Sequence, residues 1–229
     1  MLFTTAVFVL LFLPITWAGF FALGSWRPKA GIAWLFLASL FFYGWWMPEF
    51  TALLLLSIAV NFFLGQRISV LAHHTGPTAA GHSKRWLLGG VALNLGMLAY
   101  YKYANFFIAN LNLATGLAAD IGTVTLPIGI SFYTFTQIAF LVDCQRAKVR
   151  EYSFVPYGLF VTFFPHLIAG PVLHHGQMMP QFAESSVFTP NRARLVAGLA
   201  IFACGLFKKI VLAAVSAGVR MTCSMAMSE

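Results

Sequence analysis

The sequence predicts an all-α, polytopic integral membrane protein with broken or re-entrant segments, and two observations carry the prediction. Of its 229 residues, 60% are apolar and only 9% are charged, whereas soluble domains carry about 25% charged residues. The charged residues also stand between apolar runs that are long enough to cross a bilayer. This chain has too few ionised side chains to cover a globule in water, so its surface is expected to face lipid.

The net charge of +8 indicates a membrane surface and not a nucleic acid. Loops at a cytoplasmic leaflet are typically basic, whereas a nucleic-acid-binding protein gathers its basic residues in one patch or stripe. Three cysteines without metal-ligand spacing predict small buried side chains and no metal site. The basic groups that separate the apolar runs are Arg27/Lys29, Arg67/Lys84/Arg85, Arg146/Lys148/Arg150 and Lys208/Lys209.

Four charge-free runs predict the first membrane spans, because an ionised group at the bilayer centre costs about 2.5–3.5 kcal/mol. No basic residue precedes the first run, so we interpret it as a retained span and not as a signal peptide. Between the third and fourth runs, a polar stretch at Arg67–Arg85 predicts a loop. The four runs are Leu2–Leu23, Ala30–Met47, Phe50–Gln66 and Trp86–Tyr101.

The basic loops predict the orientation of the chain. They follow the first and third spans, which places the N-terminus outside and the fourth span returning outward. Two further uncharged stretches, Tyr103–Ala119 and Ile121–Val142, then precede the basic group at Arg146. If both crossed the bilayer, that group would lie outside, so one of them is expected to be interfacial or re-entrant.

Four prolines interrupt the stretch Tyr152–Ala183, which therefore is not expected to be one straight helix. We expect a short helix over Val155–Phe164 and irregular backbone from His166 to Gln181. Irregular backbone at membrane depth usually borders a site and not lipid. A last apolar helix is expected over Leu195–Phe207.

Several segments resemble the membrane-bound O-acyltransferases, in particular the branch of alginate O-acetylation membrane proteins. They follow the family's order across nearly the whole chain, and the two longest are specific. These are LPIGISFYTFTQIAFLVDCQR at Leu126–Arg146 and FVTFFPHLIAGPVLHHGQMMPQF at Phe160–Phe182, supported by Ser39–Trp46, Asn94–Phe107 and Gly205–Lys209.

The resemblance implies a many-helix fold around a tunnel, in the bacterial inner membrane. It implies transfer of an acyl group, typically acetyl, from a donor such as acetyl-CoA to hydroxyls of an extracytoplasmic polysaccharide. A separate extracytoplasmic acetyltransferase would be the partner, and no bound cofactor is expected. A histidine is the usual base for such chemistry near neutral pH.

The family's catalytic histidine commonly follows a tryptophan in a later helix, and no tryptophan precedes a histidine in this sequence. We therefore expect residues 1–229 to be a single membrane domain, the N-terminal part of the O-acyltransferase fold, inactive by itself. Residues 214–229 depart from the family's pattern.

Three residues are candidates for the acyl or acceptor path. His166 lies in the proline-broken stretch, where a structural histidine that bonds exposed backbone is the alternative. Asp143 and Arg146 match the family's Asp-x-x-Arg and would share a helix face, for donor binding or for a structural salt bridge. As alternative functions, a membrane transporter or a non-catalytic scaffold of a polysaccharide-modifying complex stays open.

Overall fold

The structure, a computed structural model, describes residues 5–74, 77–115, 122, 124–146, 153–167 and 175–209. Within these ranges the regular structure is helical throughout and contains no strand. The predicted all-α fold class is therefore confirmed. Of the expected single domain over residues 1–229, the tail 214–229 lies outside the described residues.

Two helical segments of the described chain are long and apolar enough to span a bilayer. One is the π-helix η1 (Phe8–Phe12) continued by α1 (Leu13–Trp26), and the other is α3 (Pro48–His73). Between them, α2 (Pro28–Gly44) is also apolar but shorter. Large apolar side chains point outward on these segments, for example Leu10, Leu56 and Phe63.

The predicted polar loop at Arg67–Arg85 is wrong for most of its length. Helix α3 continues to His73, and α4 (Pro77–Thr115) begins at Pro77. Polar composition does not prevent helix formation where a helix projects beyond the hydrocarbon, since its backbone bonds are internal. Proline suits the first turn, where its missing N–H has no intrahelical partner. Pro28, Pro48 and Pro77 all begin helices in this way.

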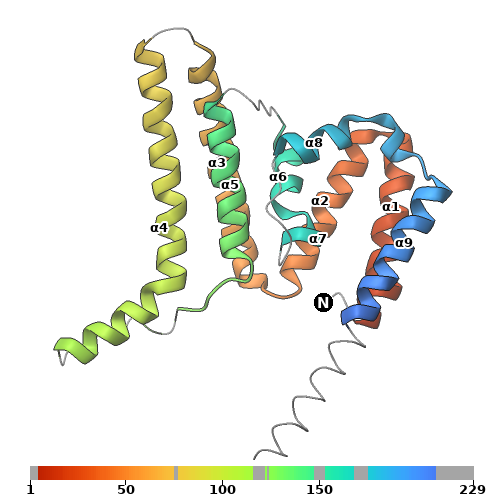
Figure 1. The fold of residues 1–229 in the computed structure, drawn as a ribbon, viewed down its shortest axis with the longest axis horizontal. Coiled ribbons are helices and arrows are strands. Elements are labelled where there is room, and N and C mark those ends of the chain that lie inside the picture. Colours follow the sequence, from red (N-terminus) through yellow and green to blue (C-terminus); the bar gives the residue numbers. More distant parts are fainter. Residues whose placement is uncertain are drawn as a thin grey trace, which may run out of the picture.

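Helix α4 includes most of the first of the two stretches that the charge pattern left open. Its 39 residues run about 58 Å and end at Thr115, so residues 103–115 continue the helix of the fourth run and do not form a separate helix. Its last third bends away from the bundle (Figure 1). Helix α5 (Ile130–Gln145) then runs back; it begins within the second of the two stretches and ends three residues past Val142. The extension is joined to the segment before α5 by paired bonds between Asn105 and the backbone of Val124, at 2.8 and 3.0 Å.

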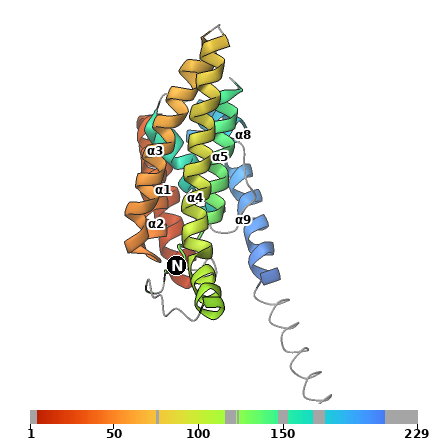
Figure 2. The same ribbon diagram turned by 90° about the vertical axis from the view of Figure 1, so that its left-hand side faces the viewer.

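The helices alternate in direction, which gathers basic residues at one end of the bundle. The α1–α2 turn, the α3–α4 connection and the end of α5 lie together at the top of Figures 1 and 2, and the α2–α3 turn and the start of α5 lie at the opposite end. We call the end at the top of these figures the basic end, because Arg27 and Arg146 cap helices there and Arg85 lies in the nearby part of α4. Lys102 and Lys208 lie elsewhere, far along α4 and after α9.

Small residues let the first two helices approach closely. A Cβ built on Gly31 would lie 2.9 Å from the Cα of Gly24 and 3.2 Å from the Phe20 carbonyl. Helix interfaces in membranes commonly use glycine in this way, because lipid offers no hydrophobic drive and close packing must supply the attraction. Helices α3, α4 and α5 form a second packed group, and α6 (Phe154–Thr162) packs against α2 and α3.

The proline-broken stretch is more helical than its sequence suggests. The short helix expected over Val155–Phe164 is confirmed as α6, but irregular backbone to Gln181 is wrong, because His166 lies in α7 (Phe164–Leu167) and α8 covers His175–Ala183. Pro180 lies inside α8, whose buried His175 and Met178 and half-buried Phe182 share one face. Packing of that face outweighs the lost backbone bond. Residues 168–174 lie outside the described residues.

The last helix, α9 (Arg192–Phe207), agrees with the predicted span and begins at a side-chain cap. The Asn191 carboxamide accepts bonds from the N–H groups of Ala193 and Arg194 at 2.9 and 3.3 Å. None of the residues of α9 is buried. Cys204 on this helix is exposed, against the expectation of a buried side chain, whereas Cys144 is buried as expected.

Candidate functional site

His166 lies in a short helix that is fixed to α2. The backbone N–H of Phe164 donates to Ser39 Oγ at 3.3 Å, and the N–H of His166 donates to the Phe163 carbonyl at 3.1 Å. The side chain of His166 is 7% exposed, and its ring centroid lies 5.6 Å from that of Phe163. The break between α6 and α7 at Phe163 therefore holds an imidazole inside the protein.

The two ring nitrogens of His166 have no hydrogen-bond partner among the described residues. The Phe160 carbonyl lies close to the ring, but its geometry is not that of a hydrogen bond. A buried donor or acceptor left unpaired costs about 1–3 kcal/mol, so natural proteins keep few of them and often for a functional reason. The alternative role, a histidine that bonds the backbone near the break, also stays a prediction, with the Phe160 carbonyl close to the ring.

Two tyrosine hydroxyls are also buried without a hydrogen-bond partner among the described residues. Tyr43 ends α2, Tyr133 lies in the first turn of α5, and each side chain is 1% exposed. Neither hydroxyl has a hydrogen-bond partner in the described structure, and the two side chains are close enough to interact electrostatically. His166, Tyr43 and Tyr133 are thus three buried polar side chains on elements that meet at the end of the bundle opposite the basic end.

Gly129 joins this group to the start of α5. It adopts φ +76° as the N-cap of α5, and a Cβ at this position would lie 2.9 Å from the carbonyl oxygen of Leu167, the residue after His166. The left-handed conformation and the contact with α7 both require glycine here. The sequence PIG therefore sets the distance between α5 and the histidine-bearing helix.

Asp143 and Arg146 lie far from His166. Asp143 is half-buried near the end of α5, and Arg146 is the exposed C-cap of that helix. Because Gly129 contacts α7 and Asp143 lies 14 residues further along α5, the two sites are about 20 Å apart along the helix. The structure thus divides the three predicted residues between opposite ends of α5, and the roles proposed for each stay predictions.

A buried network of amides, which the sequence analysis did not find, joins α3, α4 and α5. Asn61 and Asn94 exchange two bonds: Asn94 Nδ2 donates to Asn61 Oδ1 at 2.6 Å, and Asn61 Nδ2 donates to Asn94 Oδ1 at 3.2 Å. Gln137 Oε1 accepts from Asn61 Nδ2 and, at 2.9 Å, from Ser57 Oγ. All four side chains are buried. Each helix of this group therefore contributes an amide to one shared network.

The sequence does contain a signal for this network. Asn61, Asn94 and Gln137 are carboxamides within three of the predominantly apolar runs. A polar side chain in such a run must find a partner on another helix, because the lipid offers none. Three such amides in three consecutive crossings could have been predicted to meet.

From the sequence, the adjacent histidines at 174 and 175 predict an interfacial loop and not a metal site, because adjacent residues seldom point at one metal ion and no nearby Cys, Asp or Glu completes a ligand set. His174 lies outside the described residues, whereas His175 begins α8 and is buried between the rings of Phe140 and Phe160, at centroid distances of 5.4 and 5.1 Å. The loop is therefore wrong for His175. Within the described ranges, no group of three or more His, Cys, Asp or Glu side chains could hold a metal ion.

Comparison with known proteins gives a consistent set of relatives. A peptidoglycan O-acetyltransferase of Helicobacter pylori is 38% identical over 93% of this chain and 44% of its own length. The "Probable alginate O-acetylase AlgI" of Pseudomonas putida is 37% identical, and that of Pseudomonas aeruginosa 35%, each over 93% of this chain and 43% and 40% of their own lengths. The resemblance found in the sequence is therefore confirmed: over nearly its whole length, the chain is similar to proteins of the membrane-bound O-acyltransferase family. No protein-family model and no solved structure matches it.

The apolar helices and this similarity together indicate that the chain is a membrane protein. It spans less than half the length of the curated relatives that it matches. The similarity nevertheless covers nearly all of this chain, and so includes the amide network, the Gly129 contact and α7. These features belong to the part that this chain shares with the family.

Proposed function

We propose that the chain forms the membrane part of an O-acetyltransferase that esterifies hydroxyls of an extracytoplasmic polysaccharide. The observation that carries this proposal is similarity over 93% of the chain to proteins named for O-acetyl transfer to peptidoglycan and to alginate. The activity would belong to the whole protein, since the relatives are more than twice as long as the matched region. By itself, the 229-residue chain is expected to show no transfer.

The arrangement of polar groups supports a path between the two faces of the membrane. With the basic end at the cytoplasmic face of the bacterial inner membrane and the N-terminus outside, Asp143 and Arg146 would lie where an acyl donor such as acetyl-CoA arrives. His166, Tyr43 and Tyr133 would lie in the outer half, where buried hydroxyl and imidazole groups can bond an incoming acceptor hydroxyl. A separate extracytoplasmic acetyltransferase would receive the acetyl group for the final ester.

A chimaera tests this function directly. Residues 1–209 of this chain would replace the corresponding part of the alginate O-acetylase of Pseudomonas aeruginosa, in a strain that lacks its own copy. We expect acetyl esters to return to the secreted alginate, measured by alkaline release of acetate. A chimaera that reaches the membrane at the normal level and yields no acetate would contradict the proposal.

His166 gives a second prediction in the same chimaera. His166→Phe keeps an aromatic ring in the buried site but removes both ring nitrogens, and with them the proposed bond to the acceptor hydroxyl. The loss of one such bond, about 1.4 kcal/mol, should lower the acetate yield at least about tenfold. His82→Phe, at an exposed position of α4, serves as the control and should keep full yield. Equal yields from the two variants, at equal membrane levels, would assign His166 to packing alone.

A further inference from the structure

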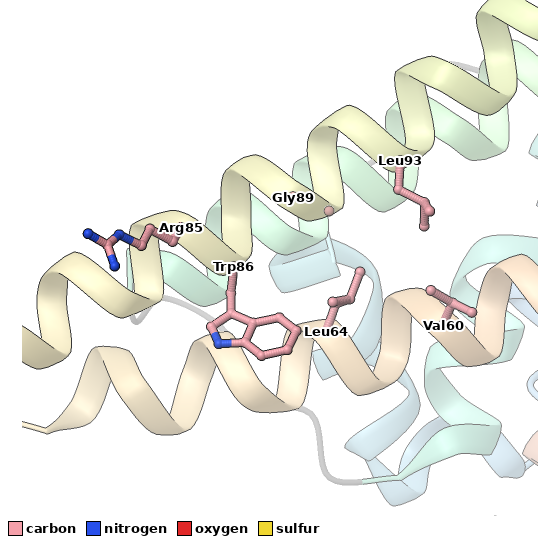
Figure 3. A pocket seen from close by; sticks show the side chains of 7 residues that line it. Val60, Leu64, Arg85, Trp86, Gly89 and Leu93 are labelled. Atoms are coloured by element: carbon pink, nitrogen blue, oxygen red, sulfur yellow. The ribbon is translucent and has the colours of Figure 1, made fainter.

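A groove between α3 and α4 opens on the outer surface of the protein, close to the basic end. It encloses about 400 Å³ and is lined by Val60 and Leu64 from α3 and by Arg85, Trp86, Gly89, Gly90 and Leu93 from α4. This volume lies within the range of about 300–1,000 Å³ for sites that hold small molecules. Figure 3 shows Trp86 reaching from α4 towards α3, with Arg85 at one end of the groove and Leu93 and Val60 at the other.

The absence of a side chain at Gly89 leaves the middle of this groove open. A Cβ on Gly89 would meet nothing within 4 Å, so the space beside it is open, whereas Gly90 faces inward against Leu141 and Leu64. Leu88 and Leu93 are exposed on the same helix, at 61% and 53%. In a membrane protein such a surface contacts lipid chains.

Charge and apolar lining are separated along the groove. The only ionisable residue of its lining is Arg85 at one end, and from there to Leu93 the helix rises about 12 Å past apolar side chains and glycine. An arginine can bond a phosphate through two N–H groups at once, while an apolar channel beside it accepts a hydrocarbon chain. A phospholipid has the same arrangement, with a charged headgroup at one end and an apolar acyl chain beside it.

We propose that this groove binds one anionic phospholipid, with its phosphate at Arg85 and an acyl chain along Trp86, Gly89 and Leu93. The position of Arg85 near the basic end places the headgroup at the leaflet that is expected to be cytoplasmic, where basic residues attract anionic lipid. The proposal depends on the membrane character of the chain and not on acyl transfer.

Quenching of Trp86 fluorescence by brominated lipids tests the proposal. The full chain would be placed in phosphatidylcholine vesicles that contain an equal minor fraction of brominated phosphatidylglycerol or of brominated phosphatidylcholine. A Trp86→Phe variant supplies the signal of the other tryptophans, which is subtracted. We expect phosphatidylglycerol to be favoured at Trp86 about fivefold, the usual effect of one basic residue near a membrane surface.

Two matched variants separate a site from general surface charge. Arg85→Gln should abolish the preference, while Lys84→Gln, which removes the neighbouring exposed charge outside the groove lining, should keep it. Gly89→Leu fills the groove and should lower quenching by both lipids. Equal quenching by the two lipids in the parent protein, or equal losses in both charge variants, would overturn the proposal. Absence of quenching by either lipid would mean that protein covers the groove and would also overturn it.

Discussion

Replacing Asn61 by leucine should lower the free energy of unfolding in detergent micelles by about 2 kcal/mol. Asn61 contacts both partners of the amide network, and its loss leaves polar groups of Asn94 and Gln137 buried with fewer partners. Single hydrogen bonds between membrane helices are worth about 0.6 kcal/mol on average and up to about 1.7. Several bonds are lost here, and a buried unpaired amide adds its own cost of about 1–3 kcal/mol.

A leucine at Asn110 is the control for this change. Asn110 is exposed on the extension of α4, and within the described part of the chain its amide bonds the Phe106 carbonyl of its own helix alone, so its replacement should change stability by less than about 0.5 kcal/mol. The double variant of Asn61 and Asn94 should be less destabilised than the sum of the single variants, because both remove the same bonds. Additive losses would show that the two amides do not interact.

The second large effect is expected at Gly129. Gly129→Ala should cost about 2–3 kcal/mol, because the left-handed backbone costs an alanine about 1–2 kcal/mol and the added Cβ presses on the Leu167 carbonyl. The displaced α7 should also lower acetate yield in the chimaera. Thermal unfolding in detergent measures the first effect and ester content the second.

Gly122 offers a matched control for Gly129. Its φ of +73° is nearly the same, but a Cβ there would meet nothing within 4 Å. Gly122→Ala should therefore show the backbone cost alone, about 1 kcal/mol. If the two variants lose equal stability and the chimaera with Gly129→Ala keeps its acetate yield, the contact between Gly129 and α7 has no effect on the site.

The fold class and the order of the spans were predictable because charge is scarce in this sequence and marks the ends of its apolar runs. Charge could not show that α3 and α4 continue through the polar stretch around Arg67–Arg85, because a helix satisfies its own backbone in water as well as in lipid. Nor could it show that residues 103–115 extend α4. That depends on the absence of a helix-breaking residue there and on the bonds of Asn105 to Val124, which link positions 19 residues apart.

The sequence predicted the candidate residues of the site but not how they are arranged. The proline-rich segment pointed to His166, and the family pattern pointed to Asp143 and Arg146, but neither could give their separation. The separation of His166 from Asp143 and Arg146 follows from the direction of α5 and from the contact at Gly129, which are features of the tertiary structure. The phenol hydroxyls of Tyr43 and Tyr133 were missed because nothing in their local sequence distinguishes them from other interfacial aromatic residues.

The amide network has a consequence for the biogenesis of the protein. The chain is synthesised from its N-terminus, so the hairpin of α3 and α4 enters the membrane before Gln137 has left the ribosome. During that interval the carboxamides of Asn61 and Asn94 can bond each other and the carbonyls of Ser57 and Gly90 in their own helices, and the bond pair between the two amides would hold the hairpin in register. When α5 arrives, Gln137 can bond Asn61 of the preformed pair. Hydrogen bonding as well as apolar packing would then position α5 against the hairpin.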